Sequence, residues 1–150
     1  MMSRALAAAL LPAMMMTVTM TADLAQATGT VTISDDRGGR IGDYLAKYQA
    51  LKRSGEEVVV DGTCASACTM LLGIIPANRI CVTPRAVFEF HAAWDMTPSG
   101  GKTISRAGDR VLWSYYPGKV RRWIVRHGGL RTQILFLRDG ELAAMFPSCH

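Results

Sequence analysis

A chain of 150 residues that is 49% hydrophobic and carries a formal net charge of +5 is long enough to bury one core. Its composition differs from that of a disordered tail, and its length excludes two large domains. The segment 1–27 raises the hydrophobic fraction, because it holds six of the nine methionines and only Arg4 and Asp23 as charged side chains. We therefore expect one domain over residues 28–150.

The N-terminal segment has the pattern of a secretory signal peptide. Arg4 precedes an apolar run over residues 5–16, and Ala25-Gln26-Ala27 has the small-x-small pattern that a signal peptidase recognises. An uncleaved membrane anchor is the alternative, but the run is short for a span of about 20 residues and Pro12 interrupts it. We predict a signal peptide over residues 1–27, cleavage near Ala27, and a periplasmic or secreted protein.

All four cysteines lie beyond this segment. An even number of cysteines in an exported protein predicts two disulfides, and the sequence leaves all three pairings open. A zinc site is the alternative, but no second close Cys/His pair follows Cys64 and Cys68. We expect no metal and no other cofactor. The cysteines and histidines concerned are Cys64, Cys68, Cys81, Cys149, His91, His127 and His150.

The first half of the domain alternates strand and helix patterns. Apolar residues at helical spacing between Ile41 and Leu51 predict an amphipathic helix that ends at Ser54-Gly55. Residues 35–39 are expected to form a glycine loop, and residues 61–66 a tight turn. The predicted strands are residues 30–34, 58–60, 79–82 and 86–91, and the predicted helices are residues 41–54 and about 67–75.

The second half is less regular. Residues 92–105 contain Pro98-Ser99-Gly100-Gly101 and are predicted to form a loop. Helices are expected over 105–116 and 119–127, and residues 132–145 are expected to begin as a strand and end as a short helix. The alternation in the first half predicts an α/β fold with a small, mostly parallel sheet, right-handed crossovers and flanking helices.

Three chemically useful features lie at or just beyond the ends of predicted strands: the pair Gly38-Gly39, Ser66 and His91. The carboxyl ends of parallel strands share one edge of a sheet, where ligands bind. A serine becomes a nucleophile when a base takes its proton, and the oxyanion it creates needs backbone N–H donors. Taken singly, these features have simpler interpretations: a helix N-cap for Ser66, a turn for the glycines and a packed side chain for His91.

The order of these features resembles the proteolytic subunit of Clp protease and the wider crotonase-like fold. The resemblance extends from Ile33 to His91, about half of the expected domain, and the separation of Ser66 from His91 matches the family's usual spacing. It implies a reduced crotonase-like domain that acts as a serine peptidase. The matching segments are SDDRGG, IGDYLAKYQAL, VVV, GTCAS, MLLG, RICVTP and VFEFH.

The resemblance also implies roles for single residues. Ser66 looks like the nucleophile and His91 like its base. The N–H of Ala67 and that of Gly38 or Gly39 look like the oxyanion donors.

The third catalytic residue of the family is an aspartate well beyond the histidine in the chain, which orients the imidazole. Asp139 is the nearest match to its position in this sequence. An exposed loop aspartate and a bare Ser–His pair are the alternatives. Because an exported protein has no supply of ATP, we expect no ATPase partner and a substrate that is a peptide or an unfolded chain.

Two other interpretations remain open at this point. Cys64 and Cys68 flank Ser66, and a thiol at a helix N-terminus is a possible nucleophile. A disulfide-stabilised binding protein that keeps the fold without the chemistry is the main alternative to the hydrolase.

The basic segment over residues 119–131 also has two interpretations. It suits an anionic membrane surface or a nucleic acid, although export makes a nucleic acid unexpected. It also suits the solvated face of a helix whose Val120, Trp123, Ile124 and His127 point inward. We expect the solvated face, with at most a weak contact to an anionic membrane.

Overall fold

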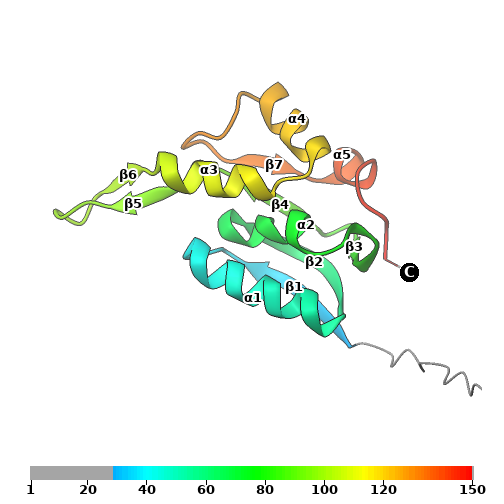
Figure 1. The fold of residues 1–150 in the computed structure, drawn as a ribbon. Coiled ribbons are helices and arrows are strands. Elements are labelled where there is room, and N and C mark those ends of the chain that lie inside the picture. The colour runs from blue at the N-terminus through cyan, green and yellow to red at the C-terminus, as the bar shows by residue number, and fades with distance from the viewer. Residues whose placement is uncertain (1–28, 150) are drawn as a thin grey trace, which may run out of the picture.

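The computed structural model describes residues 29–149 (Figure 1). The predicted signal peptide and His150 lie outside the described residues. The strands are β1 (Thr30–Asp36), β2 (Glu57–Ala65), β3 (Ile80–Val82), β4 (Val87–Phe90), β5 (Trp94–Met96), β6 (Lys102–Ile104) and β7 (Leu135–Leu137). The helices are α1 (Ile41–Ser54), α2 (Leu71–Ile74), α3 (Arg106–Tyr115), α4 (Gly118–Arg126) and α5 (Asp139–Ala143), with short 3-10 helices η1 (Ser66–Met70) and η2 (Ala77–Arg79).

The main sheet is built around β2. Strand β1 pairs with β2 in parallel on one side, and β3 and β4 pair with it in parallel on the other. Strand β3 lies along the amino half of β2, where Val60 pairs with Val82, and β4 lies along its carboxyl half, where Cys64 pairs with Phe88. Strand β7 is antiparallel to β4. The prediction of a mixed α/β fold with a mostly parallel sheet and flanking helices is confirmed.

The helices cover one face of this sheet. The chain passes from β1 through α1 to β2, and from β2 through α2 to β3, always stepping in the same direction. Two right-handed crossovers in the same direction place both helices on the same face. Figure 1 shows α1, α2 and α3 side by side there, and contacts join α1 to α2 and α2 to α3.

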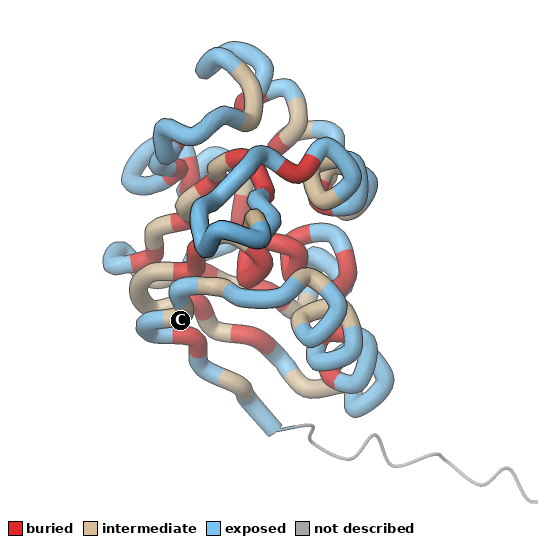
Figure 2. The backbone as a smooth tube through the Cα atoms, turned by 90° about the vertical axis from the view of Figure 1, so that its left-hand side faces the viewer, coloured by how far each residue is buried: buried red, intermediate tan, exposed pale blue. Residues whose placement is uncertain are grey.

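The core lies between the sheet and these helices. Phe88 and Phe90 of β4 are fully buried, and Phe90 contacts the rings of Tyr116 and Trp123. Glu89 lies between these two residues in β4 and therefore points to the opposite face of the sheet, where it is only partly buried. Figure 2 shows the buried positions gathered in the middle of the molecule, with exposed positions around them.

Most of the predicted elements are confirmed. Strand β1, helix α1, strands β3 and β4, helices α3 and α4, and the final strand and helix lie where the pattern predicts them. Gly55 ends α1 with a left-handed φ of 83°, and the Ser105 side chain caps α3 by accepting a hydrogen bond from the N–H of Gly108. These elements depend on the spacing of apolar residues and on the residues that begin or end a helix, and both are visible in the sequence.

The predicted tight turn over residues 61–66 is wrong. Strand β2 continues to Ala65, and Ser66 follows it with a positive φ of 55°. Thr63 pairs with Asp35 on one side and Val87 on the other, so the backbone keeps its partners despite a turn-like sequence. Gly62 fits beside an irregularity in β1, where a Cβ would lie only 1.9 Å from the Ser34 carbonyl oxygen. The helix expected after the turn begins as η1, and α2 is short.

Residues 92–105 contain a β-hairpin instead of the predicted loop. Strands β5 and β6 pair antiparallel, with Trp94 opposite Ile104, around a turn that contains Gly100 at φ 80°. Each strand has only three residues, all of them exposed, which is too short for a pattern of apolar and polar residues to predict a strand.

Four cysteines form two disulfides, as predicted, and the structure selects the pairing. Cys64 bonds to Cys68, and Cys81 bonds to Cys149. No free cysteine remains in the described part of the chain, which removes both the zinc site and the cysteine nucleophile as interpretations. Two disulfides are typical of proteins from an oxidising, non-cytoplasmic compartment. Among residues 29–149, no helix has the length and apolar character needed to span a bilayer.

The basic segment forms α4 with a solvated charged face. Val120, Trp123 and Ile124 are buried, and Arg122 and Arg126 are exposed. His127 differs from the prediction, because it is exposed and its ring stacks against the Trp123 ring at a centroid distance of 4.3 Å.

Candidate functional site

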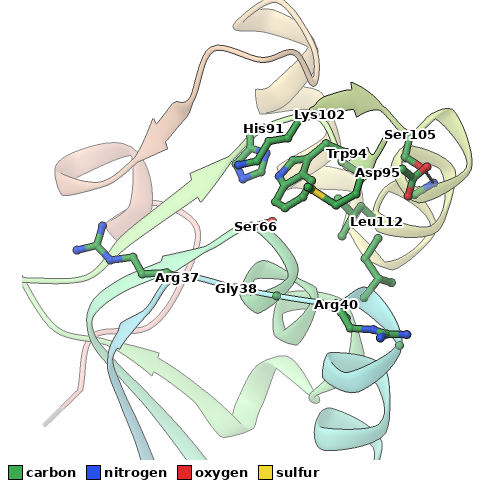
Figure 3. A pocket seen from close by; sticks show the side chains of 16 residues that line it. Arg37, Gly38, Arg40, Ser66, His91, Trp94, Asp95, Lys102, Ser105 and Leu112 are labelled. Atoms are coloured by element: carbon green, nitrogen blue, oxygen red, sulfur yellow. Dashed lines mark hydrogen bonds between the residues drawn. The ribbon is translucent and has the colours of Figure 1, made fainter. Parts of the chain in front are cut away.

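A pocket of about 800 Å³ opens at the carboxyl ends of β1, β2 and β4 (Figure 3). Ser66 directly follows β2, His91 directly follows β4, and Gly38 and Gly39 follow β1. The parallel pairing of these strands brings the four residues to one edge, and all of them line the pocket. The other walls come from the β5–β6 hairpin, with Trp94 among its residues, and from α3.

Ser66 has an unusual backbone. Its φ is 55°, in the left-handed region that a residue with a side chain rarely adopts. The helix N-cap interpretation of this serine is wrong: Ala65 occupies the cap position of η1, and no side chain caps that helix. Its hydroxyl makes no hydrogen bond within the described residues. The serine side chain is therefore not used to stabilise the turn in which it lies.

The Ser66 carbonyl is held from inside the core. The hydroxyl of Thr69 donates a hydrogen bond to it at 2.6 Å, and Tyr116 lies 2.8 Å from the same Thr69 hydroxyl. Since Thr69 gives its proton to the carbonyl, the Tyr116 hydroxyl donates to Thr69. Burial raises the pKa of Tyr116, so this donor keeps its proton at any physiological pH.

Gly38 lies against the Ser66 turn. Its φ is 79°, and a Cβ at this position would lie 2.5 Å from the Ala65 carbonyl oxygen and 2.7 Å from the Ser66 Cβ. Glycine is required here both for the backbone conformation and for the close approach. The same virtual Cβ would lie 3.1 Å from the Ala67 nitrogen, so the glycine loop and the start of η1 form one surface.

Asp36 fixes this loop, although no expected motif included it as a functional residue. Its Oδ1 accepts hydrogen bonds from the Gly38 N–H at 3.0 Å and from the Tyr44 hydroxyl, and its Oδ2 accepts one from Lys47 at 3.1 Å. The Gly38 N–H is thus committed, so of the two glycines only Gly39 has an N–H without a hydrogen bond in the described structure. The Asp-x-Gly spacing, typical of an Asx-turn, is the signal that could have identified Asp36.

The Asp36 network shifts the pKa values of its members. Burial acts to raise the pKa of the Asp36 carboxyl, but the hydrogen bonds from Tyr44, Gly38 and Lys47 outweigh it and hold that pKa below its usual value. Burial and the Asp36 carboxylate together raise the pKa of Tyr44. The carboxylate is therefore charged, and the phenol neutral, at neutral pH.

His91 is held with one ring nitrogen free. Its Nδ1 lies 2.8 Å from the Ala92 carbonyl oxygen. A carbonyl only accepts hydrogen bonds, so Nδ1 carries a proton, and in the neutral form of this ring Nε2 is the nitrogen with the lone pair. The following segment is itself anchored, because the Ala93 N–H donates to Asp109 at 2.7 Å and the Ala92 N–H donates to the Arg131 carbonyl at 2.8 Å.

The structure does not bring Asp139 to His91. Phe90, next to His91, pairs with Leu135, and β7 then runs along β4 in the opposite direction, toward the amino end of β4. Asp139 follows β7 at that far end, where it is exposed and lies 3.5 Å from Arg138. The antiparallel pairing therefore separates the two side chains, and the contact predicted for Asp139 is made by the Ala92 carbonyl.

No hydrogen bond links the Ser66 hydroxyl to the His91 ring in the structure. Figure 3 shows both residues at the same opening, with the hairpin residues above it. Their presence in one pocket agrees with their expected position at neighbouring strand ends. The catalytic roles assigned to them remain predictions.

The hairpin extends the site beyond His91. Trp94 and Lys102 line the main pocket and also a second one of about 310 Å³, which reaches Ile134. His91 lies in the walls of both pockets, and the Lys102 ammonium lies 4.0 Å from the centroid of the Trp94 ring. These residues were missed by the sequence analysis because their segment was predicted to be a loop.

Neither a scan against protein-family models nor a search of curated proteins finds a match to this chain. Fold and site together define a disulfide-bonded α/β protein with a pocket at the carboxyl edge of a mostly parallel sheet. A serine with a left-handed backbone and a histidine with a free Nε2 line that pocket.

Proposed function

We propose that the protein is an exported serine hydrolase with a reduced Clp-protease-like, crotonase-like fold, and that it acts as an ATP-independent peptidase. One observation carries the proposal. Ser66 adopts a disfavoured backbone conformation at a pocket that also contains His91, and its hydroxyl makes no hydrogen bond to any other residue in the range 29–149. Strained residues of this kind persist where the surrounding structure enforces them, and they gather at active sites.

The proposed reaction uses four groups of this chain. The Ser66 Oγ attacks the carbonyl carbon of the substrate while the His91 Nε2 takes the hydroxyl proton. The backbone N–H groups of Ala67 and Gly39 donate hydrogen bonds to the oxyanion. His91 then returns its proton to the leaving amine, and an acyl group remains on Ser66. Water, deprotonated by His91, attacks this ester, and His91 returns that proton to the Ser66 Oγ as the acid is released.

His91 works in this scheme without a carboxylate. The Ala92 carbonyl holds the proton on Nδ1 and fixes the ring, which is the positioning part of the role that an aspartate performs in a triad. A neutral carbonyl stabilises the imidazolium less than a carboxylate does. We therefore propose a Ser–His pair with a slow turnover on amides and a faster turnover on esters.

The shape of the site favours a peptide or an unfolded chain as the substrate. The two pockets share His91 and the hairpin, so a bound chain can extend on both sides of the reacting carbonyl. Trp94 and Met96 offer apolar surface, Asp95 offers a negative charge, and the positive charges come from Arg37, Arg40 and Lys102. The lining therefore suits the mixed chemistry of a polypeptide.

A non-catalytic binding protein is the second candidate. The observation that favours it is the exposed apolar hairpin, on which Trp94, Met96 and Ile104 are 45%, 59% and 50% exposed. Apolar side chains grouped in this way mark interaction surfaces. The absence of a Ser66–His91 hydrogen bond in the structure fits the same alternative.

A fluorophosphonate probe separates the two candidates. Oxidised, refolded protein that lacks the predicted signal peptide is treated with the probe, and the labelled residue is located by mass spectrometry. The hydrolase reacts at Ser66, and Ser66→Ala removes the label together with hydrolysis of an activated ester. A protein that binds peptides, shows no turnover and takes no label would overturn the hydrolase proposal and leave the binding protein.

A further inference from the structure

We propose that the Cys64–Cys68 disulfide is a positioning element for Ser66. It holds the serine in its left-handed backbone conformation and so keeps Ser66 in the wall of the pocket. The inference about backbone conformation stands on geometry alone. The inference about reactivity rests on the proposed hydrolase function.

The two disulfides differ in the length of chain that they close. Cys81 and Cys149 are separated by 68 positions, whereas Cys64 and Cys68 are separated by 4. The stabilisation that a disulfide gives by restricting the unfolded chain grows with loop length. The short disulfide therefore contributes less in this way, and its main effect is on local conformation.

The short disulfide joins the residue two positions before Ser66 to the residue two positions after it. Cys64 lies in β2, where it pairs with Asp36 on one side and Phe88 on the other, so its position is fixed by the sheet. Cys68 lies in η1, two residues after the serine. The bond holds the two Cα atoms 5.3 Å apart. The chain between them must reverse within three residues, and Ser66 takes the positive φ that makes this possible.

A second contact acts on the same residue from the core. Thr69, itself hydrogen-bonded to Tyr116, holds the Ser66 carbonyl. The disulfide fixes the path of the chain, and this hydrogen bond fixes the orientation of the peptide unit. Together they hold a conformation that serine disfavours, in a residue whose own side chain contributes no hydrogen bond to it.

Burial indicates a permanent structural role for this disulfide. Cys64 and Cys68 have no exposed surface, whereas Cys81 and Cys149 are partly exposed. A reductant reaches the long disulfide first, so the short one stays intact while the protein is folded. We therefore infer that the short disulfide is a permanent positioning element and does not act as a redox switch.

The test removes each disulfide separately. The variant Cys64→Ala/Cys68→Ala is compared with Cys81→Ala/Cys149→Ala as the matched control, each below its own Tm. Two measurements are made on every protein: the rate of fluorophosphonate labelling at Ser66, and the φ of Ser66 from its amide-to-Hα coupling and Cα chemical shift. The second measurement does not depend on catalysis.

We expect the short-disulfide variant to lose the positive φ of Ser66 and to react roughly 100-fold more slowly, as a displacement of about 1 Å in a reacting group can cause. The control variant is expected to lose thermal stability but to keep both the φ and the labelling rate. A short-disulfide variant that keeps the positive φ would overturn the proposal.

The possible failures are distinguishable. If the wild type takes no label but removal of the short disulfide changes the φ, the hydrolase proposal fails and the positioning role stands. If the wild type takes the label and the positive φ of Ser66 survives removal of the short disulfide, the positioning role fails and the hydrolase stands.

If Cys64→Ala/Cys68→Ala does not fold, the variant Cys64→Val/Cys68→Ala is used in its place, because it keeps more of the buried volume. If that variant also fails to fold, the disulfide is a folding determinant and the positioning proposal is abandoned.

Discussion

The Asp36 carboxylate accepts a hydrogen bond from the backbone N–H of Gly38 at 3.0 Å, and this contact joins an ionisable group to the surface of the candidate site. Gly38 in turn packs against the Ser66 turn. A change in the charge of Asp36 therefore reaches the glycine loop through one hydrogen bond.

The first prediction concerns acid stability. The pKa of Asp36 is lowered in the folded protein, so its contribution to stability is complete above its ordinary value of 3.8 and is lost as the pH falls toward the lowered pKa. Asp36→Asn should reduce the free energy of unfolding at pH 7 by about 1–2 kcal/mol. It should also flatten the fall in stability between pH 4 and pH 2, measured by urea unfolding at each pH.

Asp35→Asn is the control for this experiment. It removes the same charge from an exposed neighbour, whose carboxylate contacts only Arg37 in the described structure. Its pH profile should follow that of the wild type. An Asp36→Asn profile that also follows the wild type would show that the network adds no pH-dependent stability.

The second prediction concerns the backbone of Ser66. A left-handed conformation costs a residue with a side chain about 1–2 kcal/mol, and glycine avoids this at an entropic cost of about 0.5–1 kcal/mol. Ser66→Gly should therefore be more stable than Ser66→Ala by roughly 0.5–1 kcal/mol, while both variants lose hydrolysis. Thermal unfolding and an ester assay check the two parts.

Asp139→Gly is the matched control, because Asp139 is the other described residue with a side chain and a positive φ, at 52°. It should gain stability without any change in activity. If Ser66→Gly is less stable than Ser66→Ala, the serine is not strained and the main support for the hydrolase proposal is removed.

The third prediction concerns the close approach of Gly38. Gly38→Ala places a Cβ against the Ala65 carbonyl and also imposes a positive φ on alanine, so we expect a loss of about 2 kcal/mol or more and the loss of hydrolysis. Gly129→Ala imposes a similar φ of 78°, but its Cβ would meet open space. Each substitution lowers the free energy of unfolding relative to the wild type, and the difference between these two losses measures the cost of the contact alone. Equal losses would mean that the loop moves away from Ser66.

The fourth prediction concerns the partner of His91. Because β7 leaves Asp139 at the far end of β4, Asp139→Asn should not change the rate of ester hydrolysis. His91→Ala should lower that rate by about 10²–10⁴-fold, which is the usual contribution of a general base. Both expectations are tested by the steady-state kinetics of ester hydrolysis by the purified, oxidised proteins. A large loss in Asp139→Asn would contradict the antiparallel pairing of β4 with β7 in solution.

The sequence by itself determined the local elements and the approximate position of the site. The apolar spacing from Ile41 to Leu51 and the stop at Gly55 are visible in a few consecutive residues, and they predict α1 correctly. The alternation of strands and helices implies parallel pairing, and parallel pairing brings Gly38, Ser66 and His91 to one edge. An even count of cysteines was enough to predict that all of them are paired.

Only the tertiary structure decided the features that depend on residues far apart in the chain. The full length of β2 follows from its pairing with β1 and β4, which compensates for a turn-like sequence at Asp61-Gly62. The positive φ of Ser66 occurs without a glycine, in a segment where the Cys64–Cys68 disulfide spans the serine and Thr69 donates a hydrogen bond to its carbonyl. One contact between neighbouring residues was also hidden from the sequence: every residue has a carbonyl, and only the backbone conformation after β4 shows that the Ala92 carbonyl faces the His91 ring.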